Sequence, residues 1–165
     1  KKINNDLDDS IISQLTNSVL TYSDLITNRK TDYKFDLEKF TNVNGKTGIY
    51  VQYSQVRAKK LLENIETKHS ELNDLILNDV DKELLSKLYL FTYFLEQSAV
   101  LNEPHHLANY LYEISNLFNQ FYESEKILEI EDSDQLSSKM YITNLFLTTS
   151  QNVMWCLGIT PVNQM

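Results

Sequence analysis

Apolar residues recur every three or four positions over most of the chain, which is the spacing of amphipathic helices. Pro104 is compatible with a first helical turn, and Gly158 followed by Pro161 is typical of a helix end. The polar segment 28–48 contains Asn44-Gly45, so we expect it to be mostly loop. The pattern predicts helices over about 9–25, 36–41, 46–69 and 81–100, one that starts near 103–104, and one from after 132–133 to 158. The sequence therefore predicts an all-α fold, a bundle of about four to six helices.

The composition supports long helices and limits the class of protein. Three glycines and two prolines in 165 residues leave few helix breaks. No apolar run approaches the roughly 20 residues that span a membrane, and no apolar signal core follows Lys1. The single cysteine, Cys156, lies beside Trp155 in an apolar segment, and we expect both side chains to be buried. These features predict a cytoplasmic protein, and the missing initiator Met suggests a piece of a longer chain.

The charge distribution argues against a general binder of nucleic acid. The formal net charge is −8, whereas non-specific affinity for DNA or RNA comes mostly from cations that neutralise phosphates. Between Asn44 and Leu62, however, the chain has four cations and no carboxylate. Any contact with nucleic acid should therefore be local, and we expect none with DNA. The four cations are Lys46, Arg57, Lys59 and Lys60.

Two tyrosines accompany these cations. At about 100° per helical residue, Tyr50, Tyr53 and Arg57 fall within about 60° of one another. Aromatic rings next to cations suit unpaired nucleotides, because rings stack on bases while cations attract phosphates. Apolar residues such as Ile49 and Val56 border the same face, so the spacing alone favours tyrosines that are core residues with a solvated hydroxyl.

Three separated stretches of the sequence are distinctive. The first is 45–57 (GKTGIYVQYSQVR), with a Tyr-x-Gln-Tyr core and a following Arg, the second is 103–113 (EPHHLANYLYE) with 118–122 (FNQFY), and the third is 157–165 (LGITPVNQM). In this order they resemble the start, a later helix and the ending of one family, the C-terminal (DALR-type) anticodon-binding domain of arginyl-tRNA synthetases. Residues 20–25 and 32–36 resemble the last part of the catalytic core. The resemblance therefore implies a catalytic-core tail and linker over 1–45 and a helical anticodon-binding domain over 46–165.

The resemblance implies a fragment of an enzyme that uses ATP and Mg²⁺ to charge arginine tRNA. Motifs of the His-Ile-Gly-His and Lys-Met-Ser-Lys-Ser type, which bind ATP in class I synthetases, do not occur in this sequence. We therefore expect the fragment to be inactive alone and to need no cofactor. Its expected partners are the anticodon loop of arginine tRNA and its own catalytic domain.

The family's site residues transfer to positions that match its motifs. All arginine anticodons carry C at the middle position, so one pocket for that base would serve every isoacceptor. For Arg57, an ion pair that holds the helix and a phosphate contact both remain open. The resemblance assigns the anticodon to Tyr50, Tyr53, Tyr122 and Met165, and the possible phosphate contacts are Lys46, Arg57, Lys59 and Lys60.

Departures from the family pattern weaken some of these assignments. His106 and Gln164 stand where arginine is usual, and each removes a permanent cation. Ser54-Gln55 likewise replaces the usual small residue and histidine. These changes affect phosphate contacts more than the base pocket.

The sequence suggests three other interpretations. Glu66-x-x-His69 and His105-His106 offer metal-binding side chains, but a di-metal bundle needs two Glu-x-x-His pairs, so we expect no metal site. A helical module that binds a protein partner through its tyrosine face is the alternative from another class. The anticodon domain of another class I synthetase is a third possibility.

Overall fold

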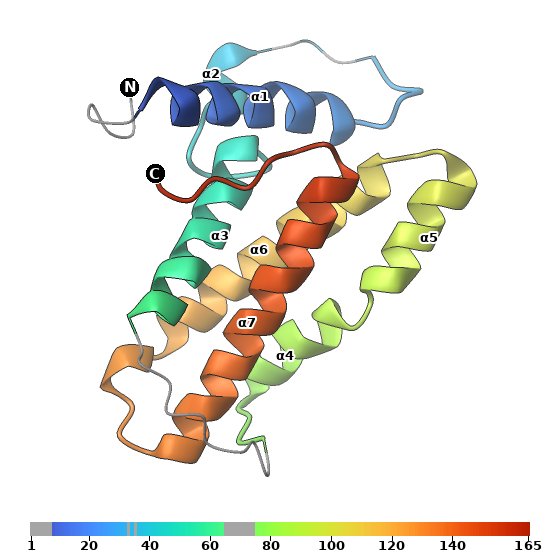
Figure 1. The fold of residues 1–165 in the computed structure, drawn as a ribbon. Helices are drawn as coiled ribbons and strands as arrows, with labels where there is room; N and C mark the ends of the chain where they lie inside the picture. The colour runs from blue at the N-terminus through green and yellow to red at the C-terminus, as the bar shows by residue number, and fades with distance from the viewer. Residues whose placement is uncertain (1–7, 33, 35, 65–74) are drawn as a thin grey trace.

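The computed structural model of the chain describes residues 8–32, 34, 36–64 and 75–165. All regular secondary structure in these ranges is helical, which confirms the predicted all-α fold (Figure 1). Most helices lie within one to three residues of the ranges expected from the sequence. The elements are α1 (Asp9–Leu25), α2 (Leu37–Phe40), α3 (Gly48–Glu63), α4 (Asp79–Leu88), α5 (Phe91–Leu101), α6 (His105–Ser124), the 3₁₀ turn η1 (Ile127–Glu129) and α7 (Ser133–Cys156).

Two expected helices differ from the sequence prediction. The helix expected over 81–100 is two helices, because the chain turns at Tyr89 and Leu90 between α4 and α5. The Tyr110 hydroxyl on α6 donates to the carbonyls of Lys87 and Leu88 at 3.2 and 3.1 Å, at the end of α4. The Lys87 carbonyl also accepts from the Leu90 amide at 3.1 Å. The helix expected over 46–69 is α3, which begins at Gly48 and ends at Glu63, while the expected positions 65–69 lie outside the described residues.

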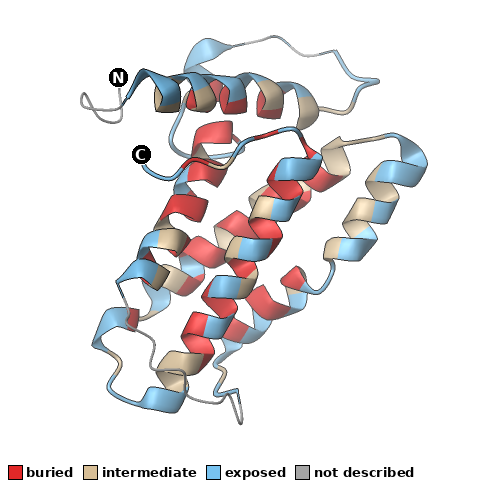
Figure 2. Cartoon of the chain, viewed as in Figure 1, coloured by how far each residue is buried: buried red, intermediate tan, exposed pale blue. Residues whose placement is uncertain are grey.

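Helix α6 is the centre of the bundle and packs against α3, α4, α5 and α7 (Figure 1). The faces that these helices turn toward one another are buried, whereas α5 contains no buried residue (Figure 2). Phe118 of α6 and Phe146 of α7 stack with ring centroids 4.1 Å apart. The large buried side chains on α6 and α7 therefore join the two longest helices of the described chain.

Helix α1 lies across the end of the bundle, and the C-terminal segment after α7 runs between α1 and α3 (Figure 1). α1 approaches the start of α3 so closely that a Cβ at Gly48 would lie 2.7 Å from the carbonyl carbon of Ser18. Farther along α1, the buried Tyr22 donates a hydrogen bond of 2.9 Å to the Ala108 carbonyl on α6. A second hydrophobic cluster fills this junction and contains Leu15, Val19, Phe40, Ile49, Val56 and Val162.

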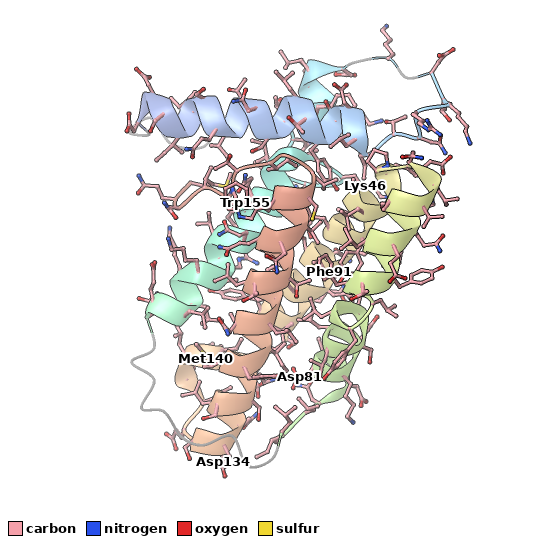
Figure 3. All side chains as sticks on the ribbon, turned by 45° about the vertical axis from the view of Figure 1, so that its right-hand side comes forward. Lys46, Asp81, Phe91, Asp134, Met140 and Trp155 are labelled. Carbon is pink, nitrogen blue, oxygen red and sulfur yellow. The ribbon has the colours of Figure 1, made fainter. Side chains whose placement is uncertain are left out.

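The expected burial of Trp155 and Cys156 is wrong. Trp155 is 64% exposed and Cys156 is also exposed, near the end of α7 (Figure 3). Val153 and Met154 face the core, and at about 100° per residue the next two positions turn outward. Among the described residues, no helix is both long and apolar enough to cross a membrane.

Candidate nucleic-acid interface

A cavity of about 520 Å³ lies between α3, α6, the loop before α3 and the C-terminal segment. This volume falls in the ~300–1,000 Å³ range of small-molecule sites, so it can receive a nucleotide base. Three of the four residues expected to bind the anticodon, Tyr50, Tyr53 and Met165, line it together. Its other lining residues are Val43, Asn44, Ile49, Arg57, Asn116, Asn119, Gln120 and Glu123.

Arg57 lies between two aromatic rings at the wall of this cavity. Its guanidinium carbon is 4.7 Å from the centroid of Tyr53 and 4.6 Å from that of Tyr122. The guanidinium also donates to the Tyr53 hydroxyl at 2.8 Å, to Asn119 Oδ1 at 3.0 Å and to Glu123 Oε1 at 3.3 Å. The ion-pair interpretation of Arg57 is therefore confirmed, while a phosphate contact stays a prediction. Arg57 thus shares its donors among three side chains and packs against the rings of Tyr53 and Tyr122.

The amide groups on α6 face α3 across the cavity. The half-buried Tyr50 donates from its hydroxyl to Asn116 Oδ1 at 3.3 Å, and burial raises the pKa of this phenol. Asn119 is buried, accepts from Arg57 and donates to the Ser54 hydroxyl at 2.9 Å. Gln120 is exposed at the rim. The amide of Asn119 is thus bonded to Arg57 and Ser54, whereas the amides of Asn116 and Gln120 are less buried.

Tyr122 contributes from the far side of Arg57. It lines a second hollow of about 300 Å³, which it shares with Tyr53, Arg57 and Met165. Lys60 is exposed and lines the same hollow. A ridge between the two cavities is therefore formed by the three residues that line both, Tyr53, Arg57 and Met165.

The two tyrosines differ in burial, which separates the two interpretations of the tyrosine face. Tyr50 packs against the core and its ring lies 5.5 Å from Tyr112, so it is partly a core residue. Tyr53 is 43% exposed and presents a ring surface to solvent. Stacking on a ligand is thus open to Tyr53, whereas Tyr50 mainly shapes the wall.

The lysines expected near phosphates lie at different places around this site. Lys46, labelled in Figure 3, donates to Asn109 Oδ1 at 2.7 Å, lies 5.5 Å from the centroid of the Tyr112 ring and lines neither cavity. Lys59 donates to Asn163 Oδ1 at 2.7 Å and lies 3.9 Å from Glu63, so it supports the C-terminal segment. Of the three lysines, only Lys60 lines one of the two cavities.

Sequence reasoning assigned Tyr122 on α6 to the site but missed the polar side chains of the same helix. Asn116, Asn119, Gln120 and Glu123 recur at spacings of three and four residues, which places them on one face of the helix. That periodicity was readable in the sequence as a polar stripe. Its position opposite Tyr53 and Arg57 depends on the packing of α3 on α6.

The histidine pair groups with one carboxylate at the start of α6. Ligand atoms of Glu103, His105 and His106 lie within 4.8 Å of one another. Glu103 already accepts from Lys30 at 2.8 Å and lies 3.3 Å from His106 Nε2. The carboxylate is therefore held by these two side chains. Glu66 and His69, the other pair considered for a metal, lie outside the described residues.

Comparison with known proteins agrees with the three motifs. Curated arginine–tRNA ligases from Francisella tularensis subsp. novicida and Alkaliphilus oremlandii are 35% and 31% identical over 133 and 169 residues. These alignments cover 76% and 98% of this chain but 23% and 29% of the relatives, so the chain spans about a quarter of the length of the curated relatives it matches.

Two solved structures share the fold. Arginyl-tRNA synthetase from Plasmodium falciparum superposes with a TM-score of 0.85 at 24% identity, over 95% of this chain and 28% of that one. The Thermus thermophilus enzyme gives 0.85 at 21% identity, over 98% of this chain and 29% of that one. Residues 51–165 match the family described as the DALR anticodon binding domain. The chain therefore belongs to the DALR anticodon binding domain family.

Proposed function

We propose that this chain binds the anticodon loop of arginine tRNA and that the cavity between α3 and α6 receives an unpaired base of that loop. The observation that carries the proposal is the stack of Tyr53, Arg57 and Tyr122 beside a cavity lined by amides. Sequence-specific recognition of RNA uses unstacked bases, which stack on aromatic or guanidinium planes and form hydrogen bonds along their edges. Both kinds of group meet at this site.

The base proposed for the cavity is the cytosine at the middle of every arginine anticodon. Its edge carries an amino donor and ring and carbonyl acceptors, and the amides of Asn116 and Gln120 can both donate and accept. The ring of Tyr53 and the side chain of Met165 would flank the base. Tyr122 would support this arrangement through Arg57.

In the same proposal, the full-length protein is a cytoplasmic arginine–tRNA ligase whose catalytic domain uses ATP and Mg²⁺. Its support is that the curated relatives, which carry that name, align over 76% and 98% of this chain. The catalytic domain is then the second partner of this chain. The chain alone would bind tRNA without charging it, because it lacks the ATP-binding motifs of class I synthetases.

Stacking and edge contacts, more than charge, would supply the affinity. Glu123 lies against Arg57 and offsets its charge at the cavity. Lys60 lines the second hollow, and we assign the main phosphate contact to it. Lys46 and Lys59, which have protein partners, would contribute less.

Binding to a short RNA stem-loop with an arginine anticodon tests the site. Tyr53→Ala should weaken binding by about 1–3 kcal/mol through lost stacking. Tyr93→Ala is the matched control, because Tyr93 is 55% exposed on α5, away from the cavity. Replacing the middle C of the loop by U should weaken binding to the native chain, and Gln120→Ala should reduce that preference. Equal affinities for all of these pairs would contradict the proposal.

Salt dependence distinguishes RNA binding from the alternative of a protein-interaction module. Affinity for the stem-loop should fall as salt rises, and Lys60→Ala should reduce the slope of log affinity against log salt by roughly one unit. Lys82→Ala on α4 is the control and should leave the slope unchanged, because Lys82 pairs with Asp79 and lines neither cavity. A stem-loop complex that ignores salt, or no complex even at low salt, would favour the alternative.

A further inference from the structure

Gln52 is completely buried on α3 and forms hydrogen bonds with two other parts of the chain. Its amide nitrogen donates to the Ser18 hydroxyl on α1 at 2.9 Å and to the Thr160 carbonyl in the C-terminal segment at 2.8 Å. Its amide oxygen accepts from the Val162 backbone nitrogen at 3.0 Å. One side chain thus joins α1, α3 and the C-terminal segment. Because both ends of the amide are used, its orientation is fixed.

The C-terminal segment depends on these contacts for its position. The Ile159 amide donates to the Met154 carbonyl, but residues 160–165 form no backbone–backbone hydrogen bond with the rest of the described chain. The segment is instead held by Gln52, by the burial of Val162 and by the bond from Lys59 to Asn163. Val162 packs in the cluster formed by α1, α2 and α3.

Met165 follows three residues after the last bond to Gln52. It is partly buried, packs against the same cluster and lines both cavities of the candidate interface. A terminal segment without secondary structure is ordered only where it is tied down. The place of Met165 in the cavity wall therefore follows from the contacts that hold residues 160–163.

We infer that Gln52 is a positioning residue that holds Met165 at the base-binding cavity, and that α1 is part of this support through Ser18. This inference rests on the proposed function, because it assigns a role to the cavity wall. It also extends the functional unit: Ser18, Leu15 and Val19 precede residue 46, where the sequence predicted the domain to begin, and precede the family match at 51–165.

The matched control is Gln55, which has the same side chain on the same helix. Gln55 is also buried, but among the described residues its amide oxygen has no hydrogen-bond partner and no hydrogen bond joins its side chain to the C-terminal segment. Gln52→Leu removes the bonds to Thr160 and Val162, whereas Gln55→Leu removes neither. Ser18→Ala is a milder variant that removes only the partner on α1.

Methyl NMR of methionine tests the inference without RNA. The chain has three methionines, and Met140 and Met154 are buried in the bundle, so they report on its integrity. In Gln52→Leu, the Met165 methyl signal should move to the position and narrow line width of a flexible chain, with Met140 and Met154 unchanged. Ser18→Ala should shift Met165 in the same direction by less, and Gln55→Leu should not shift it.

Two results would overturn the inference. One is an unchanged Met165 signal in Gln52→Leu. The other is a change of all three methyl signals in both Gln52→Leu and Ser18→Ala, which would make Gln52 a residue of general folding. Each is independent of whether the cavity binds RNA.

A double-mutant cycle then connects the position of Met165 with binding of the arginine stem-loop. Met165→Ala and Gln52→Leu should each weaken binding by about tenfold, which is about 1.4 kcal/mol, and the double variant should be no weaker than either. Additive losses would overturn the inference. If the methyl signal shifts as expected but neither single variant weakens binding, the positioning role stands and the assignment of Met165 to the RNA site fails.

Discussion

Neutralising Lys139 on α7 should be one of the most destabilising single changes in this chain. The side chains of Lys139 and of Asp81 on α4, the latter labelled in Figure 3, are each 1% exposed. The Lys139 Nζ lies 2.8 Å from Asp81 Oδ1 and 2.9 Å from Asp81 Oδ2. The same nitrogen lies 2.8 Å from Glu125 and 5.3 Å from the Phe121 ring centroid. Lys139→Met keeps most of the side-chain volume but leaves the Asp81 carboxylate buried without a cation.

The structure sets the size of the loss. Removing one partner of a buried ion pair costs about 3–5 kcal/mol. The low end applies here, because Asp81 keeps a bond from the Asn78 amide at 2.9 Å and lies in the first turn of α4, where the helix dipole favours an anion. The Glu125 side chain is 31% exposed, and although its Oε2 next to Lys139 is buried, its Oε1 keeps a hydrogen bond from the Gln135 side chain at 2.9 Å. We therefore expect a loss of about 3 kcal/mol in the free energy of unfolding.

Urea unfolding followed by far-UV circular dichroism measures this loss. With a slope of about 2 kcal/mol per M, the midpoint should fall by about 1.5 M. Lys126→Met is the control: this exposed lysine pairs with Glu129, and its loss should stay within about 0.5 kcal/mol. The variant Asp81→Asn combined with Lys139→Met should lose less than the sum of its two single changes. A loss below about 1 kcal/mol for Lys139→Met, or additive single losses, would refute the reasoning.

Three further predictions concern contacts of α1, of the buried tyrosines and of the C-terminal segment. Gly48→Ala should lower the free energy of unfolding by about 1–3 kcal/mol, because its Cβ would lie 2.7 Å from the Ser18 carbonyl carbon and α1 would have to move. Thermal unfolding measures this loss, and an unchanged melting temperature would contradict the close contact. Burial raises the pKa of Tyr22 and of Tyr110, so the folded state favours their neutral forms. The stability that these two phenols contribute should therefore be fully present below a pH of about 10, where tyrosines of the unfolded chain ionise, and should be lost as the pH rises above it. Tyr22→Phe should flatten this alkaline loss in urea titrations at several pH values, and an equal loss in both proteins would argue against the Tyr22 contribution. Deleting 163–165 removes Met165 but keeps Val162 and the bonds to Gln52, so circular dichroism should show a folded bundle while affinity for the stem-loop falls. An unfolded variant would make the deleted segment structural, and an unchanged affinity would remove Met165 from the site.

Local sequence determined the helices and one half of the candidate site. Periodic apolar residues and few glycines or prolines predicted the all-α fold, because helical hydrogen bonds and amphipathic faces are set by neighbours three or four residues apart. The same local geometry placed Tyr50, Tyr53 and Arg57 on one face of α3. The outward turn of Trp155 was equally available from its spacing to Val153 and Met154, but the apolar composition of that segment outweighed it in the prediction.

The tertiary structure decided what each of these side chains meets. The turn after α4 depends on the Tyr110 hydroxyl, more than 20 residues away in the sequence, and the partners of Arg57 on α6 are 62 and 66 residues away. Lys59 meets Asn163 across 104 residues, so a lysine that looked available for phosphate is bonded to the C-terminal segment. Helical periodicity fixes the direction of a side chain relative to its own helix axis. It carries no information about which distant face will pack against that helix, and for this reason the ridge and cavity of the interface exist only in the folded chain.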